Sequence, residues 1–213
     1  MSGLGDPRVL PDTKTMMRQR TKTILLLATA VLGATYAQPP AKDAPQYTKD
    51  GELLLPKDYR NWSFLSSSIS MSYPEEGPGG HAMFGNLFVQ PAAREQFEKT
   101  GTWPDKTVLL MELRGVGGRG GDAFLNKDAQ FQTDLHGYEA HVKDSARGGW
   151  AFYGIRSDAT SGKAVEKTAK CFSCHENHGA VDTTFVQYYP PLIEAAKQHG
   201  TYKDTNHQAS RAR

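Results

Sequence analysis

The sequence predicts an α+β protein, mainly an antiparallel β-sheet with short helices, whose C-terminal helical segment carries the functional motif. Two observations predict this fold class. Between residues 63 and 155, segments of alternating apolar and polar side chains are separated by Gly- and Pro-rich turns. From residue 163 the composition becomes helical and leads into Cys171-Phe172-Ser173-Cys174-His175. A sheet followed by a short helical region therefore describes the expected domain.

The strands are predicted by side-chain alternation. We expect them over residues 63–73, 81–90, 107–114, 130–143 and 150–155. In the second, Phe84 and Phe88 share one face, and Met83, Leu87 and Val89 share the other. In the third, Val108, Leu110 and Glu112 oppose Leu109, Met111 and Leu113.

Helices and turns are predicted by Pro, Gly and capping residues. A helix start at Pro56 turns Tyr59 and Trp62 inward, and Pro91–Thr100 is a helix closed by Gly101. Asp182 is expected to cap a helix through Phe185, Tyr188 and Tyr189, which pack against the sheet, and 191–199 forms the last helix. Residues 74–80 are a loop and 144–149 a turn. The Gly-rich segment 115–121 lacks the G-K-[ST] ending of a phosphate loop and is expected to be a flexible hairpin connection.

The N-terminus has the pattern of an export signal. Arg18, Arg20 and Lys22 precede a short apolar run over 24–33, and Thr35 and Ala37 occupy the −3 and −1 positions before Gln38. The run is too short to span a bilayer. We therefore expect a signal peptide over residues 1–37, in which 1–15 are possible extra upstream residues, and a periplasmic protein. An uncleaved membrane anchor is the alternative.

The remaining chain divides into a polar, Pro-rich tether (38–50), one folded domain (51–200) and a polar tail (201–213). Removing residues 1–37, with five basic and two acidic side chains, changes the formal charge from +2 to −1. The charge therefore gives no indication of a nucleic-acid partner.

The spacing Cys171-x-x-Cys174-His175 is that of a c-type haem attachment site. Both thiols can add to the haem vinyl groups, and His175 then binds the iron as its proximal ligand. A thioredoxin-like pair, a zinc site or a structural disulfide are alternatives. The chain has two cysteines, both in this motif, which favours one haem c bound through Cys171 and Cys174.

Several segments together resemble the cytochrome P-460 family, which includes the cytochromes c′-beta. They are Gly51–Arg60 with Trp62, Thr100-Gly101-x-Trp103-Pro104-Asp105, Glu139-Ala140-x-Val142-Lys143-Asp144, Gly149–Tyr153, and Cys171-x-x-Cys174-His175 followed by Phe185-x-Gln187-Tyr188-Tyr189-Pro190. The resemblance implies a β-rich, homodimeric periplasmic protein with one haem c and an open distal site. Members of one type oxidise hydroxylamine and carry a lysine linked to the haem, whereas members of the other type bind nitric oxide or carbon monoxide.

One departure from the family pattern bears on function. Met111 stands at the place of the cross-linking lysine, just before Glu112-Leu113. A thioether has no nucleophilic amine, and Lys106 lies five residues away, roughly 17 Å along a strand. The departure favours gas binding over hydroxylamine oxidation. Met111 is expected to line the haem edge; the alternative is an axial iron ligand.

Four further side chains are candidates for the site. Phe84 and Phe88 could form an apolar distal wall or belong to the core. Glu139 could transfer protons or face solvent, and Arg147 could contact a ligand or a haem propionate or lie in a solvated turn. His81, His136, His141 and His178 are possible iron ligands but are expected to be surface or hydrogen-bonded residues.

The expected function is binding or redox processing of nitric oxide or a related small nitrogen oxide at a five-coordinate haem, with a redox partner cytochrome possible. Hydroxylamine oxidation is the alternative, and a six-coordinate electron-transfer cytochrome is a second one.

Overall fold

The protein is described from a computed structural model, in which residues 43–70, 82–117 and 129–205 are described. The signal peptide expected over 1–37, the loop 74–80 and His81 lie outside the described residues, as do parts of the tether, of the Gly-rich connection and of the tail. Among the described residues, no helix combines the length and apolar character that crossing a membrane requires.

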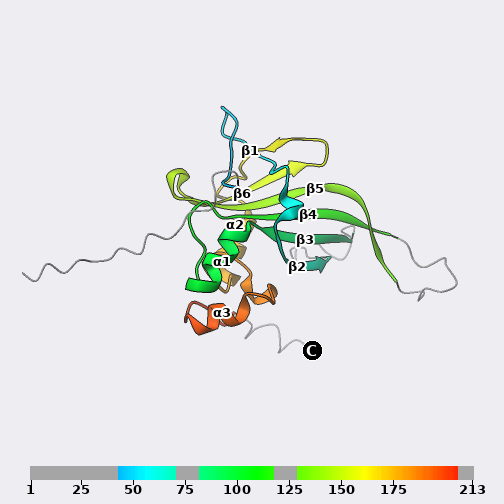
Figure 1. Ribbon diagram of the computed structural model, residues 1–213. Coiled ribbons are helices and arrows are strands. Elements are labelled where there is room, and N and C mark those ends of the chain that lie inside the picture. Colours follow the sequence, from blue (N-terminus) through cyan, green and yellow to red (C-terminus); the bar gives the residue numbers. More distant parts are fainter. Residues whose placement is uncertain (1–42, 71–81, 118–128, 206–213) are drawn as a thin grey trace, which may run out of the picture. The chain divides into compact units, whose positions relative to one another are not determined.

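The centre of the domain is a five-stranded antiparallel sheet. Its strands are β2 (Ser63–Ile69), β3 (Met83–Val89), β4 (Val108–Gly117), β5 (Phe131–Asp144) and β6 (Gly149–Arg156), and their spatial order is the chain order. Figure 1 shows these strands side by side. Every strand predicted from alternation is present, so the α+β fold class is confirmed.

The two faces of the sheet are buried against different layers. One face carries Leu109, Leu87 and Val89 and packs with α1 (Pro91–Thr100) and α3 (Ile193–Gln198). We call this face the helical face. The opposite face carries Val108, Leu110 and Val142 and packs with the N-terminal segment, including Leu53 of β1 (Leu53–Leu54). Because successive residues of a regular strand point to opposite faces, these assignments give the side of the other sheet residues wherever the register is unbroken; it shifts within β2 and in the pairing of β4 with β5.

The helix predicted over Pro91–Thr100 is present with those bounds. Proline at the first position has no N–H, and none is needed there because the first turn of a helix has no carbonyl that could accept it. Gly101 closes the helix in a left-handed conformation (φ 71°). Phe97 of α1 is fully buried against Trp103, with ring centroids 4.3 Å apart. Tyr59 and Trp62 are also buried, as predicted, but Tyr59 begins only a 3-10 turn (η1, Tyr59–Asn61).

The helix expected after Asp182 is wrong. Asp182 has a left-handed backbone (φ 51°) in a turn, and only a 3-10 turn follows (η4, Val186–Tyr188). Tyr189 packs in the core as predicted, whereas Tyr188 is more than half exposed. A single cap residue could not reveal that the chain must turn sharply here.

The predicted tether ends earlier than residue 50. Gln46 accepts a backbone bond from Leu54, and Tyr47 donates its hydroxyl to Asp144 at 3.0 Å. β1 also pairs with β7 (Ser161–Gly162). These long-range contacts make residues 46–50 part of the folded domain.

Candidate functional site

The motif lies on helix α2 (Lys170–His178), which packs against the helical face of the sheet. Cys171 and Cys174 are three positions apart and lie on one side of the helix. Both are partly buried, and they are not joined in a disulfide. Two thiols and an imidazole are therefore presented from a single rigid element.

The ring of His175 is oriented by a backbone hydrogen bond. Its Nδ1 lies 2.7 Å from the carbonyl oxygen of Thr183, an acceptor that requires the proton to be on Nδ1. Burial lowers the pKa of His175, and the bond to Thr183 offsets part of that effect. The imidazole is consequently neutral near pH 7 and has its Nε2 lone pair available for a metal.

Aromatic side chains surround His175. The centroids of Phe185, Phe152 and His141 lie 4.1, 4.7 and 5.0 Å from that of His175. Phe152 also meets Phe172 of α2 edge to face at 4.8 Å. These contacts restrict the rotation of the His175 ring and exclude water from this side of it.

His141, which the sequence led us to expect as a surface or hydrogen-bonded residue, is a buried and hydrogen-bonded neighbour of His175. It is 7% exposed, stacks on Phe152 with centroids 4.0 Å apart, and its Nε2 lies 3.3 Å from the Thr183 hydroxyl. Burial, followed by the charges of His175 and Lys167, holds its pKa well below the ordinary value. The sequence signal for this placement was that His141 stands two residues after the candidate Glu139, so that both lie on one face of the strand.

Two residues predicted for the site, Met111 and Glu139, lie in the row of paired strand residues next to the row that contains His141. Met111, Glu139 and Gly154 stand opposite one another on β4, β5 and β6, and share the helical face with His141 and Phe152. Residues two apart in a strand are separated by about 7 Å. Glu139 is exposed, and a Cβ on Gly154 would meet no atom within 4 Å. Met111 and Glu139 thus lie on the helical face one row along from His141, which contacts His175.

Phe84 and Phe88 lie on the other face of the sheet. Phe88 packs edge to face against Tyr59 and Phe64, at centroid distances of 5.6 and 5.8 Å. Phe84 has the same parity on β3. Phe88 therefore packs against the core, which is the alternative that the sequence left open. Phe84 and Phe88 do not share the face that meets α2, because strand alternation separates two faces without indicating which one meets the helix. Leu87 is the β3 residue opposite Met111 on the helical face.

Arg147 has a structural role. Its guanidinium lies 4.0 Å from the centre of the Tyr47 ring and donates to the carbonyl of Gly51 at 3.2 Å. Tyr47 packs with the core cluster on the face away from His175. The predicted contact with a ligand or propionate is therefore not supported, since Arg147 connects the β5–β6 turn to the N-terminal segment.

The other described histidines and Lys106 lie elsewhere. The Nε2 of His136 lies 2.9 Å from where a Cβ on Gly115 would stand. Gly115 is six residues, or roughly 20 Å, along β4 from Leu109, which is the residue of β4 paired with His141. His178 follows His175 on the same helix. Lys106 pairs with Asp144 and cannot take the place of a lysine at position 111.

The donor set fits a haem of the c type. Two thiols one helical turn apart and a neutral histidine with an oriented ring are the groups such a haem requires. In the row of Met111, Glu139 and Gly154, the position of a Cβ on Gly154 is open, with no atom within 4 Å. Among the described residues, no three or more His, Cys, Asp or Glu side chains are grouped so that they could hold a metal ion.

The comparisons with known proteins agree with this site. The model of the cytochrome P460 family matches residues 56–186, a range that begins just after β1 and includes α2 and the Thr183 turn. No curated protein matches the chain.

Proposed function

Because this chain belongs to the cytochrome P460 family and is a haem c cytochrome of that kind, we propose that it carries one haem c, bound through Cys171 and Cys174, with His175 as the axial iron ligand. The haem iron supplies the position at which a small molecule binds or exchanges electrons. The bond from Nδ1 of His175 to Thr183 supports this assignment, because it leaves Nε2 to face the iron.

We propose further that the iron is five-coordinate and binds nitric oxide or a related small nitrogen oxide. One observation carries this: two candidates for a second iron ligand, Met111 and His141, are engaged by other groups. The thioether sulfur of Met111 covers Gly85, at 2.7 Å from the position of a Cβ there, so the side chain lies along the sheet. His141 packs directly beside His175 and is bonded to Thr183.

The surroundings suit a small uncharged ligand. Leu87 and Met111 are apolar and stand opposite each other on adjacent strands of the helical face. An apolar wall does not stabilise a charged ligand but accommodates a diatomic gas. Met111 would then line the haem edge, as predicted from the sequence.

The absorption spectrum of the exported, haem-loaded protein tests the proposal. We expect a broad high-spin Soret band in the ferrous form that shifts when NO or CO is added. Sharp low-spin α and β bands without a response to CO would instead establish a six-coordinate electron carrier.

Hydroxylamine oxidation is a second candidate, favoured by Glu139. This exposed carboxylate lies next to Met111 on the same face and is able to accept protons during substrate oxidation. Consumption of hydroxylamine with an added electron acceptor, lost in Glu139→Gln, would support it. A strongly red-shifted Soret band would show that a lysine reaches the ring.

The cellular setting is also a proposal. The basic and apolar segments before Gln38 support export to the periplasm with cleavage near Ala37, and the family resemblance supports a homodimer and a redox partner cytochrome. The mass of the mature protein would locate the cleavage site, and sedimentation would give the oligomeric state.

A further inference from the structure

We propose that Trp103, Lys143 and Asp182 act as positioning residues for the iron ligand. They anchor the turn of residues 181–184, called here the acceptor turn, and thereby set the hydrogen bond between Thr183 and His175. This inference rests on the proposed role of His175 as axial ligand. It goes further in assigning control of the iron to side chains outside the attachment motif.

The acceptor turn needs outside support. The N–H and the hydroxyl of Thr184 both donate to the Val181 carbonyl, at 2.9 and 2.8 Å, and close the turn. Asp182 has a φ of 51°, a left-handed conformation that costs a residue with a Cβ about 1–2 kcal/mol. The conformation therefore persists because surrounding groups hold it.

Trp103 holds the turn from the side of the helices. Its indole N–H donates to the hydroxyl of Thr184 at 2.9 Å, and both residues are almost fully buried. The same ring packs on Phe97 of α1. A buried hydrogen bond between two rigidly packed residues fixes the turn relative to α1.

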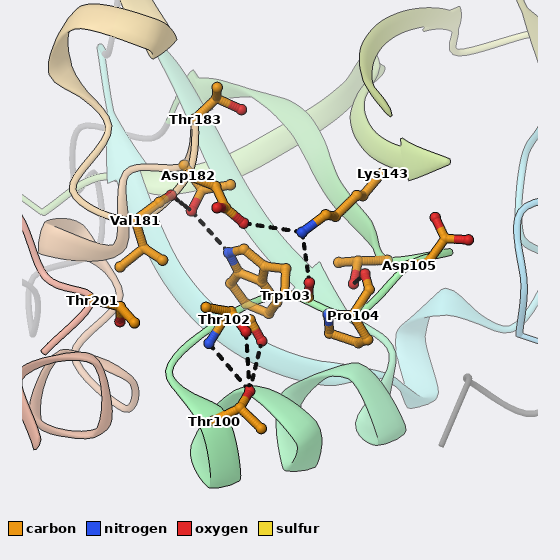
Figure 2. A network of polar contacts seen from close by, with 12 residues as sticks. Thr100, Thr102, Trp103, Pro104, Asp105, Lys143, Val181, Asp182, Thr183 and Thr201 are labelled. Atoms are coloured by element: carbon orange, nitrogen blue, oxygen red, sulfur yellow. Dashed lines mark hydrogen bonds and ion pairs between the residues drawn. The ribbon is translucent and has the colours of Figure 1, made fainter. Parts of the chain in front are cut away.

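Lys143 holds the turn from the side of the sheet. Its ammonium group is 3.2 Å from the carboxylate of Asp182 and donates to the carbonyl of Trp103 at 2.8 Å (Figure 2). Lys143 lies two residues after His141 on β5 and has the same parity. One side chain thus joins the sheet, the Trp103 segment and the strained residue of the turn.

Gly179 shows how closely the turn is fitted to α2. A Cβ on Gly179 would stand 2.7 Å from the carbonyl oxygen of His175 and 2.8 Å from both the Thr183 carbonyl carbon and the Thr184 nitrogen. All of these are backbone atoms. The end of α2 and the acceptor turn are therefore in direct contact, and a small shift of the turn changes the His175–Thr183 distance.

The consequence concerns the basicity of the ligand. A strong bond from Nδ1–H to an acceptor increases the electron density on Nε2, strengthens its bond to iron and stabilises the oxidised metal. The acceptor is a backbone carbonyl, so the protein can control it only through the position of the turn. Loosening the anchors should weaken the iron–histidine bond and raise the midpoint potential.

The test uses the haem-loaded full protein and three variants: Asp182→Asn, Lys143→Met and Trp103→Phe. Resonance Raman spectroscopy of the ferrous form gives the iron–histidine stretching frequency, and a redox titration gives the midpoint potential. We expect a lower frequency and a higher potential in each variant. The change should be larger for Lys143→Met than for Asp182→Asn, because the former removes both bonds of the ammonium group.

Asp158→Asn is the matched control. It removes the exposed ion pair with Arg156 at the end of β6 and should leave the frequency and the potential unchanged. If Trp103→Phe does not fold, Asp182→Asn decides the question, since its side chain is about one-third exposed.

Two results would overturn the inference and can be distinguished. Variants that fold like the parent protein and keep its frequency and potential would show that the anchors do not act on His175. Absence of the iron–histidine band from a parent protein whose ferrous spectrum is high-spin and five-coordinate would refute the axial role of His175, and with it the positioning role.

Discussion

Replacing Gly179 by alanine should separate the acceptor turn from α2. The backbone of Gly179 (φ −69°, ψ 127°) is one that alanine adopts freely, so the effect comes from the added methyl group alone. Ordinary contact for a Cβ begins at 3.4 Å, whereas the methyl would stand 2.7–2.8 Å from backbone atoms on both sides. The neighbouring backbone must consequently move by about 0.6–0.7 Å, a shift taken directly from those distances.

Such a shift is large for the hydrogen bond that it affects. The His175–Thr183 bond would lengthen from 2.7 Å towards about 3.3 Å, past the upper limit of about 3.2 Å for a normal N–H···O bond. Overpacking of this kind also costs about 1–3 kcal/mol of unfolding free energy. Resonance Raman spectroscopy should show a lower iron–histidine frequency, and urea unfolding should show the loss of stability.

Gly148→Ala serves as the control. Gly148 has a φ of 91° and no atom within 4 Å of where its new methyl group would stand, so alanine strains the backbone without touching the acceptor turn. It should lower stability and leave the iron–histidine frequency unchanged. A Gly179→Ala protein with the parent frequency, or an equal frequency shift in both variants, would refute the reasoning.

Three further predictions concern the sheet. Met111→Leu should leave the ferrous spectrum and CO binding unchanged, because leucine conserves the apolar wall. A low-spin spectrum in the parent protein that is lost in this variant would show that Met111 binds iron. Glu112→Gln should lower the unfolding free energy by about 1–3 kcal/mol at pH 7, measured in urea, since Glu112 is 2% exposed and accepts bonds from Tyr59, Arg60 and Arg114. Burial raises the pKa of Glu112, but these hydrogen bonds and charges lower it overall. The stabilisation that Glu112 provides is therefore complete above the ordinary carboxyl pKa of 4.5 and is lost as the pH falls below it. In Glu112→Gln the unfolding free energy should fall less steeply with decreasing pH, and a slope equal to that of the parent protein would contradict this.

Much of the fold was predictable because its elements depend on neighbours in sequence. The helix Pro91–Thr100 has a proline at its start and a glycine at its end, and the strands have an alternation that one buried face requires. The same reasoning could not decide a side chain's role where that role depends on the face it meets. Phe88 alternates as a wall residue should, yet packs on Tyr59, and Arg147 packs on Tyr47.

The sequence by itself determined the proposed attachment motif, because Cys171, Cys174 and His175 lie within five residues of one helix and their spacing alone brings them together. Only the tertiary structure decided what surrounds His175. The ring of His175 meets His141 and is oriented by Thr183, and the turn carrying Thr183 is held by Trp103. These contacts join residues up to 81 positions apart, and no local pattern records them, since they arise only when the helical layer closes on one face of the sheet.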